Sequence, residues 1–206
     1  MSAGTGAADF GSAARVYWIL RLLGHDDVAI LDGGFRAWEQ SGHAVAGGWN
    51  EPEPARFEAE LRPGLIADTG AVAHAREAGA RIVDVRPARQ YRGEEKHPQA
   101  RAAGRIPGAV NLEQDRLISA DSGSAVTGER LAAALETADL EDGGRTITVC
   151  NTGHFAAIGW FMLSEVAGRE DVAVYDGSMI AWAQDPERPL QVARSGIAGL
   201  VDWLVD

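Results

Sequence analysis

The sequence has 206 residues, of which 46% are hydrophobic and 24% charged, and its formal net charge is −11. These proportions are typical of a folded chain with one or two domains. An acidic surface repels phosphate groups, so we expect neither nucleic acid nor an anionic membrane as a partner. The single cysteine excludes an internal disulfide, and no apolar run reaches the roughly 18 residues of a membrane span.

Neither a leader peptide nor a cofactor is predicted. Residues 1–6 lack a basic segment followed by an apolar one, so we expect no secretory signal and a cytoplasmic location. The five histidines form no pair four residues apart, and the sequence has a single cysteine as a further possible metal ligand. No metal site is therefore expected. The Gly33-Gly34 pair lacks the spacing of a dinucleotide-binding loop.

Two stretches of the chain are alike across an offset of 144 residues. DVAILDGGFRAW at 27–38 matches DVAVYDGSMIAW at 171–182, and each follows an aromatic and apolar stretch, at 17–20 and 160–163. Each copy predicts an apolar helix, a short buried strand, an Asp-Gly turn and a helix that bears a tryptophan. Similarity at so long a period indicates a duplicated domain.

The two copies are unequal in what precedes them. A long segment at 65–155 leads into the second copy, whereas only residues 1–16 precede the first. Two explanations stay open: the chain starts further upstream, or residues 1–47 dock on the complete copy as a remnant. Four units are therefore expected: the C-terminal half of an incomplete first domain (1–47), a Gly- and Pro-rich linker (48–64), a complete domain (65–192) and a helical tail (193–206).

The complete domain alternates predicted helices and strands. Short β-branched or apolar runs predict buried strands at 81–85, 146–149 and 172–175, and a turn at 106–111 leads into another. Helices are expected over 70–79 after Asp68-Thr69, over 128–135 after Thr127, and over 155–167, with a long polar loop at 86–105. Such alternation predicts a parallel sheet with helices on both faces.

Cys150 directly follows the predicted strand at 146–149. In parallel α/β sheets, ligands bind at the carboxyl ends of strands. A strand–loop–helix step directs backbone amides and a helix N-terminus at the loop, and this environment stabilises a thiolate. Each hydrogen bond to a charged sulfur contributes about 1.5–3 kcal/mol, more than the helix dipole's roughly 0.3–1 kcal/mol. Gly153 is expected to take a positive φ so that the amides converge; a buried structural cysteine is the alternative.

Four segments together resemble the rhodanese family. They are IVDVR at 82–86 with Tyr91 and Gly93, GRIPGAVN at 104–111, CNTGHFA at 150–156, and DGSMIAW at 176–182, which DGGFRAW at 32–38 repeats. The resemblance covers nearly the whole chain, as a two-domain member that lacks the front of its first domain. It implies an α/β rhodanese-like parallel sheet with helices on both faces, plus a partial second copy at the N-terminus.

The resemblance also implies a sulfurtransferase. Cys150 would take sulfane sulfur from thiosulfate or a similar anionic donor, hold it as a persulfide and pass it to cyanide or a thiol. Arg86 corresponds to the family's donor-binding arginine, and a charge solvated at a strand end is the alternative reading of that residue. The implied substrate-binding loop comprises Asn151, Thr152, Gly153, His154 and Phe155, in which His154 is the one titratable side chain.

The loop departs from the family in ways that leave alternatives open. It lacks the basic residues common in thiosulfate-using members, and Gln90, next to Arg89, aligns with a second arginine common in mercaptopyruvate-using members. A phosphatase loop would need an arginine where Ala156 stands. A non-catalytic sulfur-carrier or regulatory module, whose incomplete first domain binds a partner, is the main alternative. Donor, acceptor and oligomeric state stay open.

Overall fold

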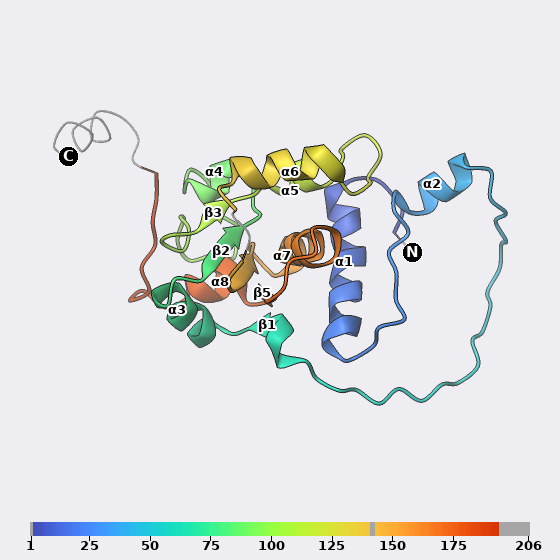
Figure 1. Cartoon of the computed structure of the whole chain (residues 1–206), viewed down its shortest axis with the longest axis horizontal. Coiled ribbons are helices and arrows are strands. Elements are labelled where there is room, and N and C mark those ends of the chain that lie inside the picture. The colour runs from blue at the N-terminus through green and yellow to red at the C-terminus, as the bar shows by residue number, and fades with distance from the viewer. Residues whose placement is uncertain (1, 141–142, 194–206) are drawn as a thin grey trace.

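A single parallel sheet forms the centre of the fold in the computed structural model, which describes residues 2–140 and 143–193 (Figure 1). In the described residues its strand order is β1-β5-β4-β2-β3. The central strand β4 pairs in parallel with β2 from Arg81↔Thr146 to Asp84↔Val149, and with β5 on its other side. The strands are β1 (Ile66–Ala67), β2 (Arg81–Asp84), β3 (Val110–Asn111), β4 (Thr146–Val149) and β5 (Val172–Tyr175).

Helices cover both faces of the sheet, as the sequence predicts (Figure 1). One face carries α1 (Ala7–Leu22), α5 (Gln114–Leu117), α6 (Gly128–Thr137) and α7 (His154–Phe161), and the other carries α3 (Thr69–Glu77) and α8 (Ser178–Trp182). Successive strand residues point to opposite faces. Val172 and Val174 of β5 therefore join the α7 core, while Ala173 and Tyr175 join the α3 and α8 core.

Helix α7 lies very close to β4 because Gly159 faces the sheet. A Cβ at Gly159 would lie 2.7 Å from Val85 Cγ1 and 3.2 Å from Thr148 Cγ2. Thr148 Oγ1 donates to Ala156 O at 2.9 Å, and Trp160 Nε1 donates to Val172 O at 3.0 Å. These contacts fix the helix on the sheet, and with it the loop that connects β4 to α7.

Most of the elements predicted for the second half of the chain are present. Asp68 begins α3, and its Oδ1 accepts from Ala71 N at 2.7 Å. The helix predicted over 155–167 ends its α-helical part at Phe161 and continues as a π-helical turn, Met162–Val166. Short elements that the sequence did not predict are β1, η1 (Pro63–Leu65), α4 (Ala88–Tyr91) and α5. The predicted helical tail falls on 194–206, outside the described residues.

The strand predicted in the N-terminal copy is wrong. Helices α1 and α2 (Gly34–Gln40) form, but the residues between them include no strand. A strand needs a neighbour for its backbone hydrogen bonds, and the edges of the sheet are β1 and β3. The copies also differ at their tryptophans: Trp182 is 1% exposed, whereas Trp38 is half-buried and its ring lies tilted against that of His43, with centroids 4.4 Å apart.

A long exposed segment without helix or strand connects α2 to the body of the molecule (Figure 1). It returns to the end of α1, where Glu60 N donates to Leu23 O at 3.0 Å. Arg62 and Arg21 both pair with Asp26 there, and the hydrogen bond from Arg62 is the main cause that lowers the pKa of Asp26 to about 2. None of the described helices combines the length and apolarity needed to cross a membrane.

Candidate active site

Cys150 directly follows the central strand β4, and its loop lies beside the start of α8. Met179 N donates to Cys150 O at 3.0 Å, and Ile180 N donates to Asn151 O at 3.1 Å. Gly153 precedes α7 with φ 79°, which confirms the predicted left-handed conformation. The loop therefore connects the carboxyl ends of β4 and β5, where parallel sheets bind ligands.

The side chain of Ser178 holds both ends of this loop. Its Oγ accepts from Cys150 N and from Gly153 N, each at 3.1 Å, and donates to Tyr175 O at 2.8 Å. One proton and two lone pairs are thereby all used. The same oxygen lies 3.9 Å from Cys150 Sγ. Ser178 is fully buried and has φ 49°, so the backbone takes a strained conformation that places this hydroxyl under the loop.

Cys150 lies at the base of the loop and is 2% exposed. Over residues 2–140 and 143–193, no acceptor is found for the backbone N–H groups of Asn151, Thr152, His154 and Phe155. Unpaired amides at the start of a helix attract an anion, because they are hydrogen-bond donors at the positive end of the dipole. The loop can therefore bind an anionic group; that these amides surround Sγ stays a prediction.

Arg86 is engaged in a buried ion pair. Its Nε donates to Asp84 Oδ1 at 2.9 Å, and its Nη2 donates to Asp84 Oδ2 at 2.6 Å and to Gly104 O at 2.9 Å. Arg86 is 2% exposed and Asp84 is fully buried. The guanidinium fastens the end of β2 to the segment before β3, and its predicted contact with a donor stays a prediction.

The other predicted loop residues have different surroundings. Asn151 Nδ2 donates to Gln90 Oε1 at 2.8 Å, while Asn151 Oδ1 is buried without a partner. His154 packs against α1, with Nε2 3.0 Å from Ala8 O. Thr152 is exposed, and Phe155 is half-buried against the α7 core. Arg89, the neighbour of Gln90 in the sequence, is exposed and forms ion pairs with Glu94 and Glu95.

Residues 69–185 match the family model described as a Rhodanese-like domain. The chain belongs to the rhodanese family. The chain is 34% identical over 179 residues to the thiosulfate sulfurtransferase of Bos taurus, a match that covers 84% of this chain and 60% of that protein. It is 31% identical over 176 residues to the 3-mercaptopyruvate sulfurtransferase of Mus musculus, a match that covers 83% of this chain and 58% of that protein.

A solved structure confirms the rhodanese fold. The 3-mercaptopyruvate sulfurtransferase SseA from Escherichia coli superposes with a TM-score of 0.72 and 29% identity, over 84% of this chain and 63% of that one. The α/β parallel fold and the family are thus as predicted. The chain spans about three fifths of the length of the relatives it matches.

Sequence reasoning missed two residues that touch the rhodanese loop, Ser178 and Arg15. A signal existed for Ser178, because the repeat aligns it with Gly34, and both have positive φ, 49° and 62°. A serine at a position that favours glycine indicates that its hydroxyl is needed. Arg15 had no such signal, because its contact with Gly153 O, at 3.4 Å, arises only when α1 packs on α7.

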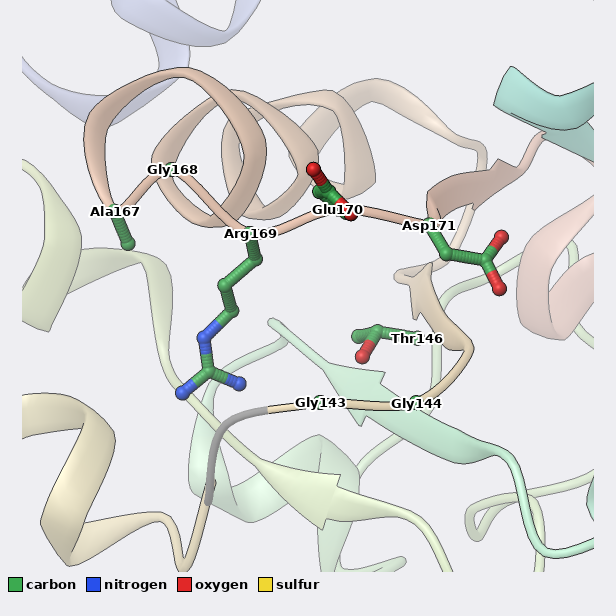
Figure 2. Close-up of a pocket in the computed structure, with 8 residues that line it drawn as sticks. All are labelled: Gly143, Gly144, Thr146, Ala167, Gly168, Arg169, Glu170 and Asp171. Atoms are coloured by element: carbon green, nitrogen blue, oxygen red, sulfur yellow. The ribbon is translucent and has the colours of Figure 1, made fainter.

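A hollow of about 440 Å³ lies at the other end of the sheet (Figure 2). Thr146 at the start of β4 and Asp171 before β5 line it, and the Arg169 side chain extends across it. Cys150 follows the opposite end of β4. The hollow therefore contains none of the predicted site residues.

Proposed function

We propose that this rhodanese is a sulfurtransferase in which Cys150 carries sulfane sulfur as a persulfide. The Cys150 thiolate attacks the outer sulfur of thiosulfate or a similar anionic donor. A bond forms between Cys150 Sγ and the outer sulfur, and the bond to the inner sulfur breaks, so that sulfite leaves with the bonding electron pair. A thiolate or cyanide then attacks the carried sulfur, and the Cys150 thiolate leaves.

One observation carries this proposal: the nucleophile candidate directly follows the central strand, in a loop that has four unpaired backbone amides among the described residues. The N–H groups of Asn151, Thr152, His154 and Phe155 have no acceptor among the described residues. Donors of this kind stabilise developing negative charge, since they are oriented before the reaction begins. Ser178 keeps them in place by binding Cys150 N and Gly153 N.

The glutamine at position 90 counts against mercaptopyruvate as the donor. Gln90 stands where mercaptopyruvate-using members often have an arginine, and its side-chain oxygen accepts from Asn151. A carboxylate donor is best bound by a bidentate guanidinium. Arg86 does not present a free pair of donors for this, because Nε and Nη2 bind Asp84 and Nη2 also donates to Gly104 O.

The test is sulfite release from thiosulfate in the presence of cyanide. The wild-type chain should turn over, and Cys150→Ser should lose all activity, since a hydroxyl in place of the thiol cannot form the persulfide. The two proteins differ by one atom, so equal melting temperatures would show that folding is unchanged. Sulfite release that survives in Cys150→Ser would refute the assignment.

A sulfur-carrying module is the second candidate, and the engagement of Arg86 with Asp84 favours it. A carrier needs the persulfide but not a bound donor. It would accept sulfur from a partner's persulfide and release no sulfite from thiosulfate. Labelled sulfur on Cys150 after exposure to a persulfide donor, without turnover of thiosulfate, would select this function.

A further inference from the structure

Arg15 of α1 reaches the loop that follows Cys150. Its Nη1 donates to Gly153 O at 3.4 Å, and its Nη2 pairs with Asp176 Oδ1 at 2.6 Å. Its Cζ also lies 4.7 Å from the ring centroid of Trp18, one turn along the same helix. A planar guanidinium can make such contacts at once, because its donors point in fixed directions.

Gly153 is the point at which these groups meet. A Cβ at Gly153 would lie 2.5 Å from Asp176 Oδ1 and 2.9 Å from Arg15 Nη1. Asp176 belongs to the turn between β5 and α8, and Gly153 to the loop between β4 and α7. Arg15 therefore adds a side-chain link between two segments that the Ser178 hydroxyl and the backbone bonds from Met179 and Ile180 also join.

The helix that carries Arg15 is firmly packed on α7. Tyr17 packs edge-on against Phe161 with ring centroids 5.1 Å apart, and its hydroxyl donates to Glu165 Oε2 at 2.7 Å. At the other end of α1, the ring of His154 lies against Ala8 O. Because these contacts hold α1 on α7 at both ends, the position of Arg15 relative to the loop after Cys150 is fixed.

We propose that Arg15 is a positioning residue for sulfur transfer. It holds Gly153 and Asp176 together, and thereby fixes the loop that carries the unpaired backbone amides after Cys150. The N-terminal helix is then part of the catalytic unit rather than a passive remnant of a first domain. This role rests on the sulfur-transfer function proposed above.

The experiment compares Arg15→Gln and Arg15→Lys with Arg21→Gln as the matched control. Arg21 lies on the same helix, is paired with Asp26, and its side chain is 26% exposed against 24% for Arg15. Three quantities are measured for the full chain: the melting temperature, the turnover number for sulfite release, and the rate of Cys150 alkylation by iodoacetamide as a function of pH. Alkylation requires no sulfur donor, so it judges the loop even if thiosulfate is not a substrate.

Arg15→Gln should lower turnover and slow alkylation near neutral pH by about ten- to a hundred-fold, as a misplaced catalytic loop does. Arg21→Gln should leave both unchanged, with a similar change in melting temperature. Arg15→Lys should recover part of the loss, because an ammonium group can still pair with Asp176 but lacks the second donor arm. Adding Asp176→Asn to Arg15→Gln should cost nothing further, since the two residues act as one unit.

Alkylation and turnover of Arg15→Gln equal to those of Arg21→Gln would overturn the role. If Arg15→Gln melts far below the control, Arg15→Lys decides: wild-type alkylation and turnover in that variant would also overturn it. A wild-type chain that alkylates but releases no sulfite would instead refute the thiosulfate reaction. The comparison of alkylation rates would still judge Arg15.

Discussion

Replacing Ser178 with alanine should destabilise the fold and loosen the loop around Cys150. The hydroxyl makes three hydrogen bonds, to Cys150 N, Gly153 N and Tyr175 O, and the residue is fully buried. Each buried polar group left without a partner costs about 1–3 kcal/mol. The loop can shift to satisfy part of this loss, so we expect the free energy of unfolding to fall by about 2–5 kcal/mol.

A glycine at the same position separates the hydroxyl from the backbone. Ser178 has φ 49°, in the left-handed region, where a residue with a Cβ is disfavoured by about 1–2 kcal/mol. Ser178→Gly loses the same three hydrogen bonds but relieves this strain. It should therefore be more stable than Ser178→Ala by about 1 kcal/mol, although glycine gains more entropy in the unfolded chain.

Urea unfolding gives the stabilities, and iodoacetamide gives the reactivity of Cys150. Ser164→Ala is the control, because that hydroxyl is exposed and, within the part of the chain that the structure describes, bonds only to Glu165 Oε1. Its effect should stay within about 0.5 kcal/mol. A Ser178→Ala protein as stable as this control, with wild-type alkylation, would refute the reasoning.

Three further changes test other parts of the structure. Gly153→Ala, whose Cβ would lie 2.5 Å from Asp176 Oδ1 at φ 79°, should cost about 2–4 kcal/mol in urea unfolding and lose most sulfur transfer; near-wild-type behaviour would contradict the close packing. Arg86→Met should cost about 3–5 kcal/mol, since it leaves the Asp84 carboxylate buried without its counter-ion. Unchanged stability with a raised KM for thiosulfate would contradict this structural role and favour donor binding by Arg86. Burial, and then the hydrogen bond to Glu165, raise the pKa of Tyr17 from 10.0 to about 12. Stability should therefore fall as pH rises through this range, and Tyr17→Phe should remove that part of the fall. An identical pH dependence of stability in both proteins would contradict the raised pKa.

The fold of the second half could be predicted because its strands are short, apolar and separated by helix signals. The runs at 81–85, 146–149 and 172–175 became β2, β4 and β5 within a residue. The two-residue strand β1 escaped prediction, since a segment so short carries no periodicity. The N-terminal copy gave a strand pattern without a strand, because pattern alone does not supply a neighbouring strand.

The candidate site was partly predictable for a similar reason. Local sequence located Cys150 at a strand end and required a positive φ at Gly153, both of which the structure shows. Asp84 lies two residues before Arg86, but the sequence does not show that the two side chains pair, and the contact of Arg86 with Gly104 O depends on the fold. Arg15 and Ser178 reach the loop from segments distant in sequence, and only the packing of α1 on α7 and the turn after β5 bring them there.

The most direct test of the central claim is the mass of the Cys150 peptide after the chain has been incubated with thiosulfate. The proposed function predicts that one sulfur atom is added to Cys150, that reduction or cyanide removes it, and that sulfite appears in equal amount. An unmodified Cys150 in a folded protein, with no sulfite in solution, would contradict persulfide formation from thiosulfate.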